Sequence, residues 1–225
     1  MKFEYPELTT ISENGMRFYK TPDENFYPSV TTVLGGTLPP EKSKALANWA
    51  NAIGAVNAQK KTQAAADRGT AVHLMIERHL KGEPPFSPGE FEQPIINSFN
   101  ALKLKLKNIN DVWCQEAALF SHTLGIAGRV DCIGEYKGTP SIIDFKTSTR
   151  IKTDKDIEDY RLQLTAYAVM HNEMFGTDIN HGVVLMTSDS GFPQEFHVDL
   201  GDYVGPLCDR VVEFYKKKLG IDWKF

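Results

Sequence analysis

The segment IIDFK, at residues 142–146, carries an acid and a base at a spacing that suits catalysis. Side chains two residues apart on a strand leave the same face of a sheet. Asp144 and Lys146 therefore share one face, while Ile143 and Phe145 share the other. The pattern predicts a polar strand face with a carboxylate next to an ammonium group.

A second aspartate is expected opposite the first. Lys137-Gly138 fits a two-residue loop between two antiparallel strands, and that loop sets their register. In this register Asp131 lies directly opposite Asp144. Because like charges directly opposite each other destabilise a sheet, a bound cation with oxygen ligands is the simplest explanation for the pair. The spacing therefore predicts a metal site.

A third acid joins the row under a second register assumption. If residues 122–125 form a four-residue loop, Glu116 lies opposite Asp131 on the neighbouring strand. Hairpin loops of about two to five residues are all common, so other registers remain open. The other interpretation is a surface ion pair between Asp144 and Lys146 on a solvated sheet face, which contributes little to stability.

Composition places the chain among ordinary globular proteins. Its 225 residues are enough for one α/β domain with a full core. The net charge of −4 argues against nucleic acid as a partner on a whole-protein basis, but acidic metal ligands lower the total wherever they occur. Basic residues gather locally at Lys60-Lys61, Arg68, 103–107 and 216–218.

Several classes of protein are disfavoured by the sequence. No segment has the apolar length of a membrane span, and the N-terminus lacks a signal-peptide pattern, so we expect no membrane partner and a cytoplasmic location. Cys114, Cys132 and Cys208 are isolated, which indicates core thiols rather than a disulfide framework, a zinc site or an iron–sulfur site. The spacing of an EF-hand loop is absent, which disfavours a structural Ca²⁺ site.

The N-terminal part is expected to be a hairpin followed by helices. Turn signals predict a peripheral β-hairpin from about residue 16 to 27. Ser29 caps a short helix that ends at Gly35-Gly36, and Pro39-Pro40 opens the next helix. The long helix after Gly54 places His73 on a face beside its apolar stripe. A lone histidine there is more often an interface residue than a ligand.

The rest of the chain is expected to alternate strands and helices. Ser87 and Glu90 form a capping box that predicts a helix from 87 to about 109. The expected strands are 112–121, 126–136 and 139–146 in an antiparallel meander, then 181–188 and 195–198. A helix from Thr153 to about Asn172 separates the two groups, and residues 199–219 form a terminal helix.

Four motifs in this order resemble the PD-(D/E)XK nuclease superfamily. They are RGTAVH at 68–73, GRVDCIG at 128–134, IIDFKTS at 142–148 and LQLTAY at 162–167. Within the superfamily the chain is most similar to RecB-like exonucleases, in the branch of the mitochondrial genome maintenance exonuclease and its bacteriophage relatives. The resemblance extends to PSVTTVL at 28–34 and covers most of the chain.

The resemblance implies metal ligands and catalytic residues. The implied ligands of Mg²⁺ or Mn²⁺ are His73, Asp131, Asp144 and the backbone carbonyl of Phe145. Lys146 is implied to orient or deprotonate the attacking water. The family's remaining catalytic positions match Glu116, Gln163 and Tyr167.

The resemblance also implies DNA contacts at Arg68, Thr70, Ser29, Thr31, Ser148 and Tyr160. Tyr160, Gln163 and Tyr167 share one face of the expected helix, although such a strip also suits an ordinary surface. Aromatic rings there would let bases of a single strand stack.

Phosphodiester hydrolysis requires the same groups on chemical grounds. An oxygen-bound cation neutralises phosphate charge and lowers the pKa of a bound water, and a second charge supports attack or departure of the leaving oxygen. Carboxylates and a carbonyl suit Mg²⁺ or Mn²⁺, and one imidazole shifts the preference slightly towards Mn²⁺.

We therefore expect a single α/β (α+β) nuclease domain over 1–225, with a restriction-endonuclease-like core. A mixed β-sheet flanked by helices is expected at 111–225, with a hairpin and helical region at 1–110 covering the site. The expected activity is metal-dependent exonucleolytic hydrolysis of single-stranded DNA ends in replication, recombination or repair. We expect a monomer with a recombination or replication protein as partner, in the host bacterial cytoplasm if the chain is phage-encoded.

Two alternatives stay open. One is a structure-specific endonuclease with the same site. The other is a DNA-binding module of the same fold that lacks turnover.

Overall fold

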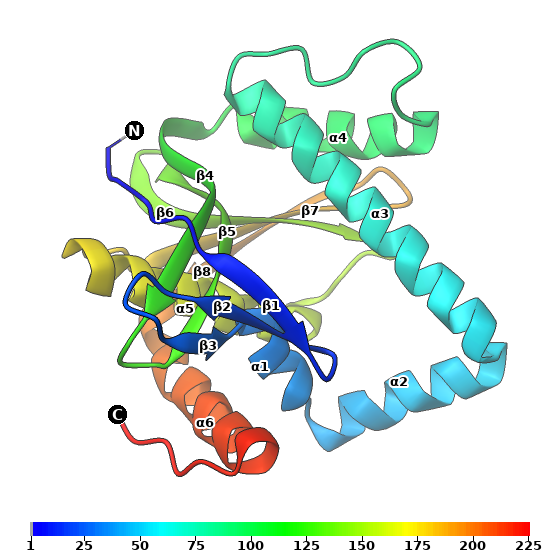
Figure 1. Ribbon diagram of the computed structural model, residues 1–225. Helices are drawn as coiled ribbons and strands as arrows, with labels where there is room; N and C mark the ends of the chain where they lie inside the picture. The colour runs from blue at the N-terminus through cyan, green and yellow to red at the C-terminus, as the bar shows by residue number, and fades with distance from the viewer. Residues whose placement is uncertain (1) are drawn as a thin grey trace.

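A five-stranded mixed sheet lies at the centre of the computed structural model, which describes residues 2–225 (Figure 1). Its strands are β4 (Ile109–Ser121), β5 (Ile126–Tyr136), β6 (Thr139–Ser148), β7 (His181–Ser188) and β8 (Pro193–Asp199), and they adjoin in that order. β4, β5 and β6 form the predicted antiparallel meander, β7 is parallel to β6, and β8 is antiparallel to β7.

Both predicted hairpin loops are present, and they fix the predicted register. Lys137 and Gly138 have φ of +51° and +82°, which suits the two-residue turn that matches strand twist. Cys132 consequently pairs with Ile143, one step before the position where Asp131 faces Asp144. This local turn chemistry brings the acidic residues onto neighbouring strands.

One helix carries the chain from β6 across the sheet to the parallel strand β7. It begins with a 3₁₀ turn (Asp154–Ile157) and continues as α5 (Glu158–Phe175). The predicted capping box is complete, because the Thr153 side chain and the Asp156 carboxylate each bind the other's backbone N–H. Gly176 ends the helix in a left-handed conformation.

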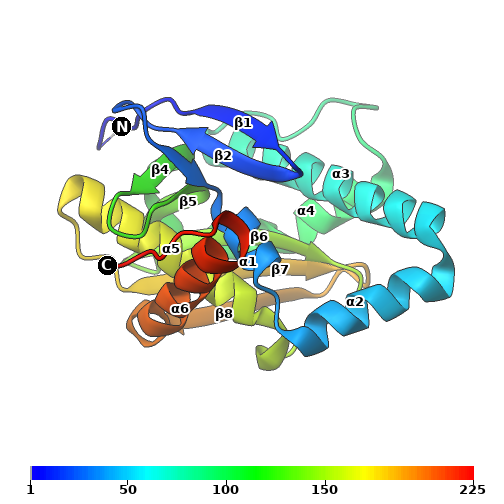
Figure 2. The same cartoon turned by 60° about the horizontal axis from the view of Figure 1, so that its bottom comes forward.

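Helices cover both faces of the sheet (Figures 1 and 2). One face packs against α5, with α1 (Val30–Gly36) and α6 (Val204–Phe214) outside it, while the other packs against α3 (Ala55–Leu80) and α4 (Gln93–Leu106). The alternation along β6 decides this, because Ile142 joins the apolar cluster on the α5 side and Ile143 joins the one on the α3 side. Short turns flank α6 at Leu200–Tyr203 and Tyr215–Leu219.

A separate three-stranded antiparallel sheet comprises β1 (Thr9–Glu13), β2 (Met16–Lys20) and β3 (Phe26–Pro28). The prediction that this hairpin is peripheral is wrong. Tyr19 and Tyr27 are buried against Ala127 of β5, and a backbone bridge joins Ser29 to Ala127. Apolar packing therefore fixes the small sheet beside the central one.

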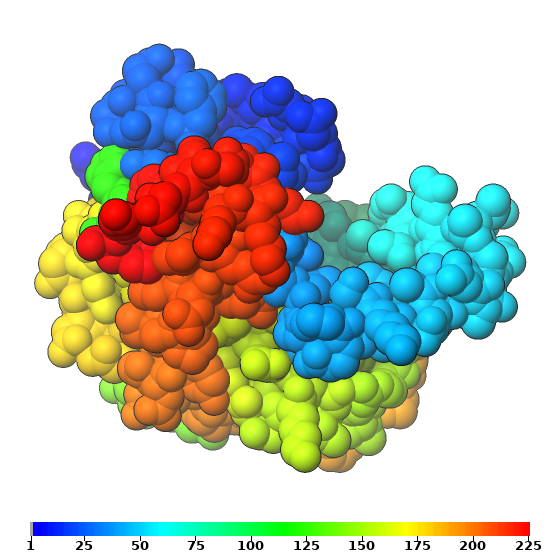
Figure 3. Space-filling view, turned by 90° about the horizontal axis from the view of Figure 1, so that it is seen from below, coloured from blue at the N-terminus to red at the C-terminus, as the bar shows by residue number. Residues whose placement is uncertain are grey.

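Helix α2 (Pro40–Ile53) differs from the other helices because none of its residues is buried. Leu46 and Trp49 are exposed on it. Figure 3 shows α2 and the adjoining part of α3 standing out from the body of the molecule. This projecting part is tied to α5 by Lys42, whose Nζ lies 3.0 Å from Glu158 Oε2 and 3.2 Å from Asp159 Oδ2.

The helix predicted from residue 87 begins six residues later, at Gln93. The Ser87 N–H donates to the Glu90 carboxylate at 2.9 Å, but the segment forms a turn in which Gly89 has a φ of +80°. A left-handed residue cannot continue a helix, so α4 starts only where Pro94 takes an early helical position. The helix also ends at Leu106, and Ile109 belongs to β4.

The predicted core thiols are confirmed for Cys114 and Cys132, which are buried, whereas Cys208 is partly exposed. All three cysteines are free. Among residues 2–225, no helix combines the length and apolar character needed to cross a membrane.

Candidate active site

Asp131 is held in place by the neighbouring strand. Its Oδ2 accepts a hydrogen bond of 2.9 Å from the backbone N–H of Phe145. The pairs Gln115–Cys132 and Ala117–Val130 keep the predicted register on the other side, so Glu116 faces Asp131. The row of acids across three strands is therefore formed as the loop lengths predicted.

Asp144 and Lys146 form an ion pair in which the acid is buried and the lysine is partly exposed to the site. Lys146 Nζ donates to Asp144 Oδ1 at 2.6 Å, and Asp144 is only 1% exposed. Asp144 Oδ2 also faces the ammonium group, with Nζ 2.5 Å away, and it has no other polar partner. A metal ion would be a further partner for this buried oxygen. The alternative of a solvated surface pair is wrong.

Burial and charge change the proton affinities of this pair. Burial raises the pKa of Asp144 to about 6, although Lys146 opposes the shift. Burial disfavours the charged form of Lys146, but Asp144 and Asp131 outweigh it and raise the pKa of this lysine. Lys146 therefore keeps its proton at neutral pH.

His73 reaches the acids from α3, on the opposite side of the sheet from α5. Its Nε2 lies 2.8 Å from the carbonyl oxygen of Phe145, and its Nδ1 lies 3.8 Å from both Glu116 Oε1 and Asp131 Oδ2. Burial disfavours protonation of His73, but Glu116 and Asp131 outweigh it and raise the pKa of His73 to about 9. The structure thus favours a site residue over a plain interface histidine.

The donor set fits a hard divalent cation. Ligand atoms of His73, Glu116 and Asp131 all lie within 4.8 Å of one another, and the buried carboxylate of Asp144 adds an oxygen donor. Clustered carboxylates with one imidazole and the carbonyl of Phe145 match the ligands that Mg²⁺ and Mn²⁺ take. Glu116 has a φ of +50°, an uncommon conformation for this residue type that is typical of functional positions.

Helix α5 adds a glutamine and two tyrosines to the site. Gln163 Nε2 lies 3.4 Å from Tyr167 Oη, and Lys146 Nζ lies 5.2 Å from the centre of the Tyr160 ring. Burial raises the pKa of Tyr167, so its hydroxyl stays protonated. Gly128 makes the close approach possible, because a Cβ there would lie 2.9 Å from Tyr167 Cε1.

Most of the predicted site residues line one cavity of about 470 Å³. Those that line it are His73, Glu116, Asp131, Lys146, Gln163, Tyr167, Ser29 and Thr31. We call this space the catalytic cavity. The buried Asp144 joins it through its ion pair with Lys146.

Four predicted DNA-contact residues do not line the catalytic cavity, and one of them, Tyr160, lies beside Lys146. Arg68 forms an ion pair with Asp189 and lines a different cavity. Thr70 is exposed on α3, and Ser148 is buried with its Oγ 3.3 Å from the backbone nitrogen of Arg150. The ion pair between Arg68 and Asp189 joins α3 to the turn after β7, a contact that the motif alone does not specify.

Four polar or aromatic residues that line the catalytic cavity were not predicted as site residues. They are Thr10, Arg17, Tyr19 and Arg129. Arg17 Nη2 donates to Thr31 Oγ1 at 3.1 Å, and its guanidinium lies 5.7 Å from the centre of the Tyr19 ring. The two-residue spacing of Arg17 and Tyr19, and of Arg129 and Asp131, was an available signal for a shared strand face.

Comparison with known families confirms the predicted resemblance. A family model of the PD-(D/E)XK nuclease superfamily matches residues 82–188, which include Asp131, Asp144 and Lys146 but not His73. The five-stranded mixed sheet flanked by helices agrees with that fold.

Curated relatives carry the name mitochondrial genome maintenance exonuclease 1. The Mus musculus protein is 29% identical over 180 residues, which cover 77% of this chain and 53% of that protein. The Homo sapiens protein is 27% identical over 182 residues, covering 77% and 52%. The chain thus spans about half the length of the curated relatives it matches.

A solved structure supports the fold alone. The crystal structure of a candidate exonuclease from Eubacterium rectale has a TM-score of 0.50 and 14% identity, covering 69% of this chain and 68% of that one.

Proposed function

We propose that this chain is a Mg²⁺- or Mn²⁺-dependent DNA exonuclease that acts on single-stranded ends. The observation that carries the proposal is the convergence of Asp131, the buried Asp144–Lys146 pair and His73 at one cavity. The family match and the exonuclease names of the curated relatives support the reaction class.

The metal would be held by the acidic row together with the group from α3. The residues concerned are His73, Glu116, Asp131, Asp144 and the carbonyl of Phe145. When bound, a divalent cation neutralises phosphate charge and lowers the pKa of a coordinated water. A bound cation would also reduce the repulsion that remains among the carboxylates of the row beside Lys146 and His73.

Lys146 would supply the second charge. Because Asp144 and Asp131 raise its pKa, its ammonium group stays protonated and can donate hydrogen bonds to the attacking water or to a phosphate oxygen. The ion pair with Asp144 fixes the direction of the ammonium group. Tyr160, whose ring lies 5.2 Å from Lys146 Nζ, limits the space on that side.

Single-strand use is supported by the charge of the catalytic cavity and by an exposed aromatic ring on α2. Arg17 and Arg129 line the cavity and add positive charge beside the acids, which suits the phosphates of a strand. Trp49 is exposed on α2, where an unpaired base can stack on its ring. The projecting part formed by α2 and the start of α3 would guide the strand towards this opening (Figure 3).

A structure-specific endonuclease would use the same residues, so the ends of the substrate must decide between the two. The experiment follows cleavage of single- and double-stranded oligonucleotides labelled at the 5′ or 3′ end, with Mg²⁺, Mn²⁺ or EDTA. We expect stepwise shortening of single strands with either metal and none with EDTA. Cleavage of circular single-stranded DNA would instead favour the endonuclease, and no cleavage of any substrate would favour a binding module.

The biological setting is proposed from the same resemblance. A single-strand exonuclease would act in DNA replication, recombination or repair, and we expect it to work as a monomer.

A further inference from the structure

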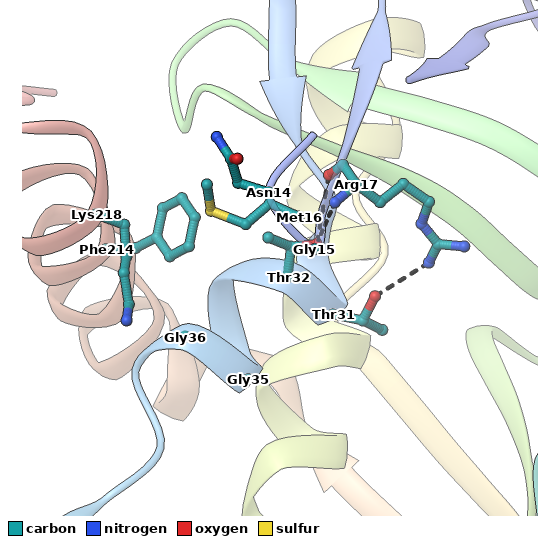
Figure 4. A pocket seen from close by; sticks show the side chains of 10 residues that line it. All are labelled: Asn14, Gly15, Met16, Arg17, Thr31, Thr32, Gly35, Gly36, Phe214 and Lys218. Carbon is teal, nitrogen blue, oxygen red and sulfur yellow. Dashed lines mark hydrogen bonds between the residues drawn. The ribbon is translucent and has the colours of Figure 1, made fainter. Parts of the chain in front are cut away.

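A second cavity adjoins the catalytic cavity and has a volume of about 570 Å³. Both cavities are lined by Arg17 and Thr31, so these two residues form their common border. Its walls come from the β1–β2 turn, from α1 and from the end of α6 (Figure 4). We call it the α1–α6 cavity. No part of the proposed reaction uses it.

The polar lining of the α1–α6 cavity suits an anion. Arg17 and Lys218 line it, and among residues 2–225 no carboxylate does. Thr31, Thr32 and Asn14 add uncharged hydrogen-bonding groups. By contrast, a third cavity that also borders the catalytic one through Glu116 and Arg129 is lined by Glu7 as well. A phosphodiester strand leaving the catalytic cavity would therefore meet less repulsion at the α1–α6 cavity.

The remaining walls of the α1–α6 cavity are formed by apolar side chains and by glycines. Met16 and Phe214 form an apolar wall, and the Phe214 ring packs against Gly36 of α1, where an added Cβ would lie 2.9 Å from it (Figure 4). A Cβ built on Gly35 would meet no atom within 4 Å, so the cavity is open at this point. The volume falls in the range of roughly 300–1,000 Å³ that small-molecule sites occupy. Charge, an apolar wall and size together fit one nucleotide.

We propose that the α1–α6 cavity binds the nucleotide of the substrate strand that neighbours the cleaved linkage. This inference rests on the proposed nuclease function and identifies where the substrate strand continues beyond the catalytic cavity. Arg17 lies at the border with its guanidinium bonded to Thr31 Oγ1, where it can contact the phosphate joining the two nucleotides. Lys218 then contacts the next phosphate, and Met16 covers the base.

Filling the cavity provides the first test. Gly35→Leu adds a side chain at an open, exposed helical position without a positive φ, so α1 can accept it. The matched control is Gly205→Leu in α6, which is also exposed and has no atom within 4 Å of its Cβ position. Binding of a fluorescent 12-nucleotide single strand is measured in Mg²⁺ on the Asp144→Asn background. We expect roughly tenfold weaker binding for Gly35→Leu only.

Removing charge provides the second test. Lys218→Gln and Lys216→Gln change the net charge equally, but only Lys218 lines the cavity. Each phosphate contact with a single strand contributes about 0.7 to the slope of log K against log salt. We expect Lys218→Gln to make the slope shallower by about that amount and Lys216→Gln to leave it unchanged. When Asp144 is intact and the protein can cleave, Gly35→Leu and Lys218→Gln should each raise the KM for the single strand and leave kcat unchanged.

The outcomes separate the two proposals. If each variant binds like its control within twofold, the subsite is wrong, whatever the enzyme cleaves. If the wild-type protein cleaves no DNA but the cavity variants lose binding, the subsite holds and the catalytic proposal fails. Thermal unfolding of each variant verifies that the fold is intact.

Discussion

The backbone N–H of Phe145 donates to Asp131 Oδ2, while the carbonyl of the same residue lies 2.8 Å from His73 Nε2. One peptide segment thus ties a carboxylate on β5 to an imidazole on α3. The side chain of Phe145 meanwhile packs in the apolar cluster beneath α3. Packing of one aromatic residue therefore sets the distance between groups that come from separate parts of the chain.

Removal of the buried carboxylate should abolish cleavage without unfolding the protein. Asp144→Asn keeps the shape of the side chain but removes the negative charge that would hold the metal and that pairs with Lys146. We expect cleavage of a labelled single strand to fall by at least roughly 100-fold. Asp202→Asn, on an exposed residue far along the chain, is the control and should retain full activity. Normal activity of folded Asp144→Asn would exclude the proposed site.

Metal should stabilise the folded chain. A ligand that binds only the native state adds about 2.7 kcal/mol at a concentration 100 times its Kd. We expect Mg²⁺ or Mn²⁺ to raise the Tm of the wild-type protein, and EDTA to reverse the change. Asp131→Asn should lose this response but unfold no earlier in EDTA, since the Asn side chain can still accept from Phe145. An equal Tm shift in both proteins would place the bound metal elsewhere.

His171 should lower the stability of the protein as the pH drops from about 6.5 towards 4, whereas Asp144, with its pKa raised to about 6, should oppose this change below pH 6. His171 is fully buried, with ring nitrogens 3.1 Å from Tyr5 Oη and 2.8 Å from Thr177 Oγ1, and burial lowers its pKa to about 4. Below pH 6.5 His171 binds a proton in the unfolded chain but not in the folded chain. Its contribution therefore lowers the free energy of unfolding by about 1.4 kcal/mol per pH unit. Urea unfolding at pH 7 and pH 5 measures the change.

The comparison protein for that measurement is His171→Gln. It removes the ionisable group, so its loss of stability between pH 7 and pH 5 should be smaller by about 2 kcal/mol. Identical pH dependence in both proteins would mean that His171 titrates normally in the folded state.

A methyl group at Gly128 should disturb Tyr167. The added Cβ would lie 2.9 Å from the ring, so either the ring or β5 must shift. We expect Gly128→Ala to cost about 1–3 kcal/mol of unfolding free energy and to reduce activity. The control, Gly69→Ala on α3, places its Cβ 4.0 Å from Thr147 Oγ1 and should be neutral or slightly stabilising. Denaturant unfolding measures both.

Local sequence determined the catalytic row. The Lys137-Gly138 turn and the four-residue loop at 122–125 fix the strand register, which aligns Glu116, Asp131 and Asp144. The register can be predicted from the sequence because the length and backbone conformation of a turn depend on only a few adjacent residues. The capping box at 87–90 shows the limit of such signals, since its hydrogen bond formed while a left-handed glycine prevented the helix.

Tertiary structure alone decided what surrounds the row. Whether β1–β3 stays peripheral or borders the site depends on Tyr19 and Tyr27 packing against Ala127, more than 90 residues away in sequence. The same holds for Arg68, which an ion pair with Asp189 draws away from the catalytic cavity. Hydrophobic packing is non-directional, so the sequence pattern of an apolar segment does not indicate which distant segment it packs against. The sequence therefore determined the chemistry of the strands, and packing of distant segments determined the walls around them.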